Sequence, residues 1–403
     1  MEFDLSDDQV ALAEAARTFL ASSWDHARLR EFVGTPGEPI AASTAPTSEL
    51  WHEMCDQGWL AVEVPEAAGG LGLGLVEVAV LCEEIGKSLA PTPVLAGITA
   101  LDALRIARSR DNEYCDEWLD RLASGDATAC VSLSRKRGAL TGALDNKGGW
   151  VLLGRSDPVV HGPSSDLAIV VAGIDSTDQD ACRRVAEADE TAPGIVSSDP
   201  LCAGRAVFLI RLDNHVRPSA HAAMDRTRLV GRLETDGASC LLIGGPRAAS
   251  RLVNRYVTGI CAEMLGASKQ VLDMTVAYAK ERVQFGRPIG SFQAVKHRCA
   301  DMLVDVEGMR SVAYYAAWCV GHDTQDSSEA ASAAKTWCSE AAARVMSSGL
   351  QVHGGIGFTW EHDLHLYLKR SQLDQVSFGD AQVHRERLSH LLRAKLERGE
   401  PIL

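Results

Sequence analysis

The sequence has no run of about 20 uninterrupted apolar residues, the length that a membrane-spanning helix requires. Its first residues, MEFDLSDDQVALAEAARTF, contain no basic stretch followed by a long apolar segment. They are therefore unlike a secretory signal. Both absences predict a soluble, cytoplasmic protein that does not act in a membrane.

Cysteines at metal-ligand spacing are also absent. The 11 cysteines form an odd number and include no Cys-x-x-Cys pair, which a zinc site or a redox dithiol commonly uses. Because thiols sit readily in protein cores, we predict buried free cysteines and no metal site.

Positive charge is scarce relative to negative charge. The chain has 40 Lys and Arg against 54 Asp and Glu, a formal net charge of −14. A broad cationic surface supplies most of the non-specific affinity for nucleic acid and anionic membranes, so neither is an expected partner. The 403 residues, 46% of them hydrophobic, suffice for a large core, in one multi-part globular unit or in two to three domains.

The first third of the sequence has helical periodicity. Ser6 and Gln9 have the spacing of a capping box, and apolar residues then recur at helical intervals as far as Leu20. Similar patterns follow over residues 48–59 and 76–89, with Pro and Gly between them. We predict an N-terminal α-helical domain over residues 1–125.

The middle third changes to short β-rich runs. These are ACVSLS, GWVLLG, DLAIVVAG and RAVFLIRL, separated by Gly, Pro, Asp and Ser. They predict a middle β-domain over residues 126–242. The charged stretch at 175–194, DSTDQDACRRVAEADETAPG, reads as a solvated loop within that domain.

The last third consists of long amphipathic patterns. Residues 249–284 contain no proline, and residues 301–320 and 327–350 resemble them. Long helices with short breaks favour an antiparallel four-helix bundle, which we place over residues 243–403. The predicted class is α+β: a helical N-terminal domain, a middle β-domain and a C-terminal bundle.

Two segments of the bundle carry the functional assignment. Residues 281–302 read ERVQFGRPIGSFQAVKHRCADM, and residues 350–370 read LQVHGGIGFTWEHDLHLYLKR. They resemble the Arg-x-x-Phe-Gly-x-Pro-Ile-x-x-Phe-Gln and Gln-x-x-Gly-Gly-x-Gly-Phe patterns of the acyl-CoA dehydrogenases. Both motifs stand in the family's order and spacing, and the helix, β, helix order extends the resemblance over nearly the whole chain. It implies the acyl-CoA dehydrogenase fold and FAD as cofactor.

The residue types in these segments suit a dinucleotide. Arg282 offers a permanent charge and a fork of donors for a pyrophosphate. Phe285 offers a flat apolar surface, and the amides of Gln293 and Gln351 can both donate and accept. Taken singly, Arg282 would be a solvated helix-end charge and Phe285 a core residue; the joint pattern favours a cofactor site.

The glycine pair Gly354 and Gly355 adds backbone access. Without side chains, it lets N–H groups approach a cofactor closely, although such a pair alone would more often be a turn. By resemblance, the set grips FAD that is bound mainly by a neighbouring subunit. Its predicted members are Arg282, Gln284, Phe285, Ile289, Phe292, Gln293, Gln351, Gly354 and Gly355.

A catalytic base is missing from both places where the resemblance locates it. The family's reaction removes an α-proton, which needs a carboxylate within hydrogen-bond reach. In the commonest arrangement this Glu stands where the present chain has Phe378. In a minority it precedes the glycine equivalent to Gly266, where the chain has Tyr256. Neither side chain takes up such a proton near neutral pH, so we assign no catalytic residue.

Other acidic residues are weak substitutes for that base. Asp380 lies two residues past Phe378, with His384 and Glu386 further along, and each is expected to be solvated or to cap a helix. Glu263 lies about 10 Å from Tyr256 along a helix and would need a different substrate pose.

The middle domain departs from the family as well. Aligning GWVLLG with the family's strand puts Pro158 and Val160 where a Trp and a Thr usually line the flavin. Proline has no N–H and valine has no hydroxyl, so the resemblance implies a loss of flavin-facing donors.

By this resemblance, the chain keeps the residues that contact FAD in a neighbouring subunit. It lacks the catalytic base and the flavin-facing donors of its own middle domain. This division resembles the non-catalytic subunit of heteromeric α2β2 acyl-CoA dehydrogenases, known from actinobacterial degradation of steroid side chains. It predicts a partner to a catalytic chain in α,β-desaturation of a bulky, for example steroid-derived, acyl-CoA. Two alternatives stay open: a self-sufficient homomeric flavoenzyme with a relocated base such as Asp380, and a flavin-free scaffold.

Overall fold

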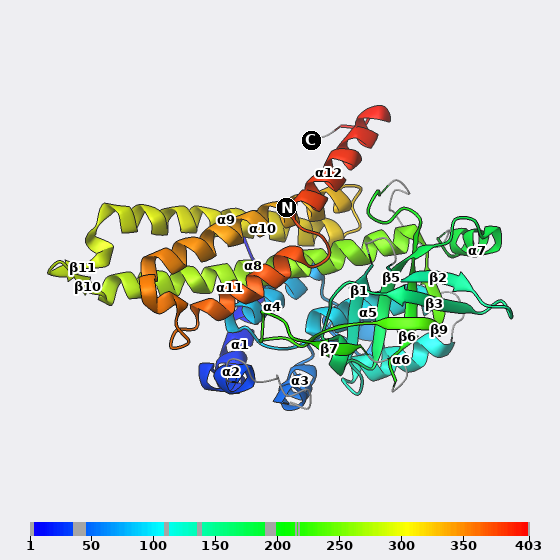
Figure 1. Cartoon of the computed structure of the whole chain (residues 1–403), viewed down its shortest axis with the longest axis horizontal. Helices are drawn as coiled ribbons and strands as arrows, with labels where there is room; N and C mark the ends of the chain where they lie inside the picture. Colours follow the sequence, from blue (N-terminus) through cyan, green and yellow to red (C-terminus); the bar gives the residue numbers. More distant parts are fainter. Residues whose placement is uncertain are drawn as a thin grey trace.

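The computed structural model describes residues 4–34, 46–108, 113–134, 139–189, 199–213, 216 and 218–401. Over these residues the chain forms an N-terminal group of helices, a sheet region and a long helical bundle (Figure 1). This order agrees with the helix, β, helix pattern predicted from the sequence. Within the described residues, no helix combines the length and apolar character needed to cross a bilayer.

The N-terminal part consists of α1 (Asp7–Ser23), α2 (His26–Val33), α3 (Pro46–Asp56), η1 (Glu66–Ala68), α4 (Leu75–Ser88), α5 (Val94–Arg108) and α6 (Glu113–Ala123). The predicted capping box is confirmed at the start of α1. The Gln9 N–H donates to Ser6 Oγ at 3.2 Å, and the Ser6 N–H donates to Gln9 Oε1 at 2.9 Å. Helix α4 is buried along most of its length and packs against the first helix of the bundle.

The middle part contains β1 (Ala129–Leu133), β2 (Thr141–Leu144), β3 (Trp150–Arg155), β4 (Val159–Val160), η2 (Gly162–Ser164), β5 (Leu167–Ile174), β6 (Arg205–Arg211), β7 (Ser219–His221), β8 (Val230–Arg232) and β9 (Glu234–Gly244). The larger sheet has the order β1-β5-β2-β3-β9-β6. Because β5 also pairs with β6, with Ile169 opposite Leu209, this sheet closes on itself. Phe208 and Leu152 lie in the core it encloses.

The prediction of a solvated loop at 175–194 is wrong for the central part of this stretch. Residues Gln179–Asp189 form helix α7, whereas 190–194 lie outside the described residues. Asp178 Oδ1 accepts the N–H groups of Asp180 and Ala181, each at 3.0 Å, as an N-cap does. Ala181 and Val185 are buried on one face. The many charges on the other face concealed an amphipathic helix.

The C-terminal part contains α8 (Pro246–Glu281), β10 (Val283–Gln284), β11 (Arg287–Pro288), η3 (Ile289–Ser291), α9 (Gln293–Gly321), α10 (Ser327–His353), η4 (Gly354–Phe358), α11 (Leu364–Val376) and α12 (Ala381–Glu397). Helices α8, α9 and α10 lie side by side, with the β10–β11 hairpin at one end and the sheet region beyond the other (Figure 1). All cysteines are free and most are buried, as predicted.

Candidate functional site

The helices that lead into the two sequence motifs pack together towards one end of the bundle. Tyr278 of α8 stacks on His353 of α10, with ring centroids 4.6 Å apart and planes at 21°. A Cβ at Gly349 would lie 2.7 Å from Val271 Cγ1, so the two helices approach closely here. Arg282 follows Tyr278 by one helical turn. We call residues 282–293 and 351–358 the bundle tip.

The predicted cofactor residues of the bundle tip lie at its surface. Phe285 is 91% exposed and has a φ of +55°, a backbone region that costs a non-glycine residue free energy. Its ring meets Phe292 edge-on at 6.1 Å, and the Arg287 guanidinium lies 4.2 Å from the Phe292 ring centroid. The chain therefore holds an apolar ring outward, as a binding surface requires.

Three further features leave the bundle tip open to a polar ligand. A Cβ added at Gly354 or Gly355 would meet no atom within 4 Å, so the backbone is accessible there. Arg282 is exposed, and no carboxylate pairs with it among the described residues. Gln293 and Gln351 are exposed too. These residues fit a phosphate-bearing, partly aromatic group such as FAD.

A separate cavity of about 400 Å³ lies where the three parts of the chain meet. We call it the central pocket. Tyr256 and Phe378 line it with their ring centroids 4.4 Å apart. The resemblance assigns these two positions, far apart in sequence, to the catalytic base. Burial raises the pKa of Tyr256 above its ordinary value of 10, so its phenol stays protonated near neutral pH.

Carboxylates also line the central pocket, but they have partners. Glu263 forms ion pairs with Arg228 and, at 3.8 Å, with Arg370. Asp374 pairs with Arg228 at 2.7 Å. Asp380 caps α12 by accepting the Val383 N–H at 3.0 Å, the capping role expected for it. A carboxylate held by a guanidinium is a weak proton acceptor.

Of the other residues considered from the sequence, some line the central pocket and others do not. Pro158 and Val160 line the central pocket. The expectation that His384 is solvated or caps a helix is wrong: it is buried outside the central pocket, and its Nε2 lies 3.0 Å from the Phe378 carbonyl oxygen. Glu386 is exposed and accepts a hydrogen bond from Gln382 at 3.1 Å.

His161 is a pocket residue that sequence reasoning missed. It lines the central pocket and is 6% exposed, with a φ of +62°. Burial and the nearby cations Arg228 and Arg370 lower the pKa of His161 well below 6.5. The imidazole is therefore neutral at pH 7 and resists protonation. No spacing or motif marks His161 in the sequence.

A pH dependence follows from a buried histidine in the first turn of α11. Burial, with Lys369 nearby, lowers the pKa of His365 from 6.5 to about 4. Below pH 6.5 the unfolded chain binds a proton that the folded imidazole does not, so stability falls from there towards pH 4. We expect His365→Gln to flatten the fall in melting temperature over this range. The exposed control His390→Gln should leave it unchanged; an equal effect of both would contradict the assignment.

Comparison with known proteins agrees with this architecture. Models for the acyl-CoA dehydrogenase N-terminal and C-terminal domains match residues 6–126 and 244–392. Acyl-CoA dehydrogenase IpdE2 of Mycolicibacterium smegmatis is 33% identical over 342 residues, covering 83% of this chain and 86% of that protein. Acyl-CoA dehydrogenase FadE27 of Mycobacterium tuberculosis is 32% identical over 346 residues, covering 83% and 85%.

Solved structures give the same result. The ChsE4-ChsE5 complex from Mycobacterium tuberculosis has a TM-score of 0.80 and 28% identity, covering 98% of this chain and 99% of that one. A variant of the Tcur3481-Tcur3483 steroid ACAD has a TM-score of 0.81 and 26% identity, covering 97% and 99%. The chain belongs to the acyl-CoA dehydrogenase family of oxidoreductases, whose cofactor is FAD. The predicted family and fold are thereby confirmed.

Proposed function

We propose that the chain is a non-catalytic subunit of a heteromeric acyl-CoA dehydrogenase, completing the FAD site of a catalytic partner. The observation that carries this proposal is the contrast between two regions. The bundle tip presents Arg282, Phe285 and the Gly354-Gly355 backbone outward, whereas the central pocket has Tyr256 against Phe378 where a base is required. The chain can thus contribute residues to the FAD site of a partner, but it lacks the base that catalysis needs.

Each exposed group of the bundle tip has a role in this assembly. Arg282 pairs with the pyrophosphate, Phe285 packs against the cofactor, and the Gly354-Gly355 N–H groups approach it. Bound FAD would supply the hydride acceptor for the desaturation. The partner supplies the carboxylate that takes the α-proton, because Glu263, Asp374 and Asp380 at the central pocket are already held by other groups.

The assembly and substrate are inferred from the relatives. The ChsE4-ChsE5 complex consists of two different chains, and the Tcur3481-Tcur3483 protein is a steroid ACAD. We propose an α2β2 arrangement acting on a bulky, steroid-derived acyl-CoA. The alternative of a homomeric enzyme requires Asp380, which lines the central pocket, as its catalytic base. The hydrogen bond that Asp380 accepts from the Val383 N–H, as a helix cap, argues against that role.

Replacing Arg282 with Ala is expected to weaken FAD retention by the co-purified complex about tenfold or more, because a charge-assisted bidentate contact is lost. Flavin absorbance per mole of complex, followed through dialysis, measures this. Arg183→Ala, on the distant and exposed α7, is the matched control. Equal retention by both variants would remove Arg282 from the cofactor site.

A further inference from the structure

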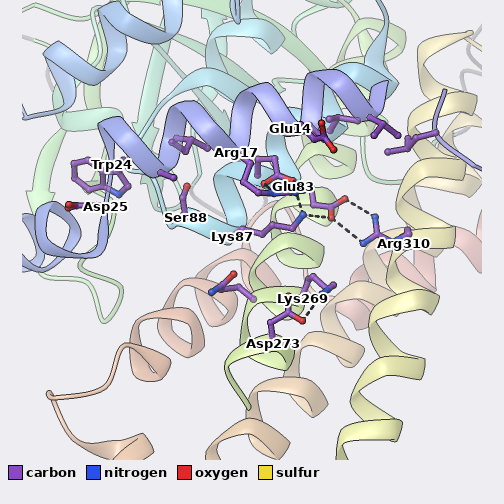
Figure 2. Close-up of a pocket in the computed structure, with 18 of the residues that line it drawn as sticks. Glu14, Arg17, Trp24, Asp25, Glu83, Lys87, Ser88, Lys269, Asp273 and Arg310 are labelled. Carbon is purple, nitrogen blue, oxygen red and sulfur yellow. Dashed lines mark hydrogen bonds and ion pairs between the residues drawn. The ribbon is translucent and has the colours of Figure 1, made fainter. Parts of the chain in front are cut away.

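A second cavity lies beside α1, apart from the central pocket. Its volume is about 780 Å³, and Figure 2 shows its lining side chains between α1 and helices α4, α8 and α9. We call it the α1 cleft. None of its lining residues lines the central pocket. Its volume suits a small molecule, and neither FAD nor the acyl group is assigned to it.

One wall of the α1 cleft is apolar. Val10 is 43% exposed at this wall. An apolar side chain in a concave surface favours an apolar occupant, because its contact with water is then removed. The wall is formed by Leu5, Val10, Ala13, Leu20, Ala21 and Trp24, with Val80 from α4.

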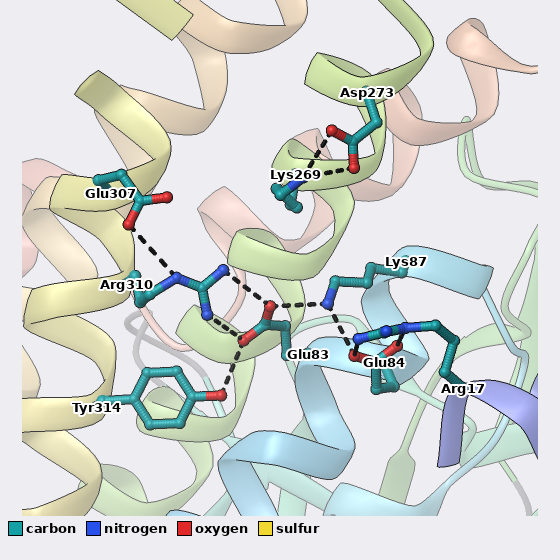
Figure 3. A network of polar contacts seen from close by, with 9 residues as sticks. All are labelled: Arg17, Glu83, Glu84, Lys87, Lys269, Asp273, Glu307, Arg310 and Tyr314. Carbon is teal, nitrogen blue, oxygen red and sulfur yellow. Dashed lines mark hydrogen bonds and ion pairs between the residues drawn. The ribbon is translucent and has the colours of Figure 1, made fainter. Parts of the chain in front are cut away.

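The facing side of the α1 cleft is an ion-pair network (Figure 3). Glu83 accepts hydrogen bonds from Arg310 and Tyr314 at 3.1 and 2.8 Å. Lys87 pairs with Glu83 and Glu84 at 2.9 and 2.8 Å. An ammonium has three N–H donors, so Lys87 keeps one for an acceptor in the cleft.

Three cations of this network, Arg17, Lys87 and Arg310, lie nearer to solvent than Glu83 and Glu84, with which they pair. Arg17 pairs with Glu84 at 2.9 Å, yet their side chains are 58% and 3% exposed. Arg310 and Glu83 are 32% and 5% exposed. Glu83 and Glu84 therefore form the floor, and the positive groups paired with them lie nearer to the opening. Lys269, whose ion-pair partner among the described residues is the exposed Asp273 at 2.6 Å, adds another cation from α8.

We propose that the α1 cleft binds an amphipathic ligand with a single anionic head group. Its apolar part lies against α1, and the head group lies between Arg17, Lys87 and Lys269. Glu14 and Asp25 line the same cleft and repel a ligand with several negative charges more strongly than one with a single negative charge. A monocarboxylate fits this pattern better than a polyphosphate. The proposal does not rest on the proposed function above.

Isothermal titration of the full chain with decanoate tests this site, with decan-1-ol as the uncharged probe. We expect one decanoate per chain, bound about tenfold more tightly than decan-1-ol, because the alcohol lacks the charge-assisted contacts. Excess coenzyme A, a polyanion, should not displace decanoate. Equal binding of acid and alcohol, displacement by coenzyme A, or no decanoate binding would each overturn the proposal.

Variants locate the binding in the α1 cleft. Arg17→Gln should weaken decanoate binding about tenfold and leave decan-1-ol binding unchanged. Ala13→Phe fills the cleft and should abolish binding of both probes. Arg183→Gln on α7 is the control for removal of an exposed charge. If circular dichroism shows that Arg17→Gln has lost the native fold, Lys269→Gln takes its place. Parental decanoate affinity in the charge variant and in Ala13→Phe would refute the site.

Discussion

Replacing Arg387 with Ala is expected to lower the free energy of unfolding by about 3–5 kcal/mol, the cost of leaving a buried charge without its partner. Arg387 projects from α12 and is 2% exposed. Its Nε donates to Asp199 at 2.9 Å and its Nη2 to Asn254 Oδ1 at 2.7 Å. These bonds join α12 to the segment before β6 and to α8.

Urea unfolding monitored by circular dichroism measures the Arg387 effect. Arg385, two residues earlier on α12, supplies the control, because its ion pair with Glu340 is exposed. Arg385→Ala should cost no more than about 1 kcal/mol. A loss for Arg387→Ala as small as that of the control would show that the buried contacts do not hold α12 in place.

Replacing Gly266 with Ala is expected to destabilise the fold by about 1–3 kcal/mol through overpacking. A Cβ at Gly266 of α8 would lie 1.9 Å from the Glu83 carbonyl oxygen of α4 and 3.0 Å from Lys87 N. Both neighbours are backbone atoms and cannot rotate away. The gain in helix propensity, about 1 kcal/mol, offsets only part of this cost.

The Gly266 effect is separable from glycine replacement in general. A Cβ at Gly173 would meet nothing within 4 Å, so Gly173→Ala should be tolerated. Thermal melts of both variants measure the difference. If Gly266→Ala melts at the parental temperature, α4 and α8 are not in backbone contact at this crossing.

The sequence allowed much of the fold to be predicted because its signals were local. The capping box at Ser6 and the alternation of β-rich and helical texture depend on neighbouring residues alone. Helix α7 was missed because charges outnumber the two buried residues, Ala181 and Val185, that orient it. Apolar periodicity is a weak signal over so short a segment.

The candidate site was predictable where motifs carried it. Arg282 and Gly354 could be found because they stand in fixed patterns. Sequence alone could not show that Tyr256 contacts Phe378, since 122 positions separate them and only packing joins them. The ion pair between Glu263 and Arg228, the burial of His161 and the α1 cleft likewise arise from tertiary contacts that leave no motif.

We propose above all that this chain contributes residues to the binding site of an FAD with which another chain catalyses desaturation. Expression of the chain alone and together with a catalytic acyl-CoA dehydrogenase chain, followed by visible spectra and desaturation assays, tests it most directly. We predict colourless, inactive protein alone, and a yellow, active complex on co-expression. A yellow protein that desaturates acyl-CoA without any partner would contradict the claim.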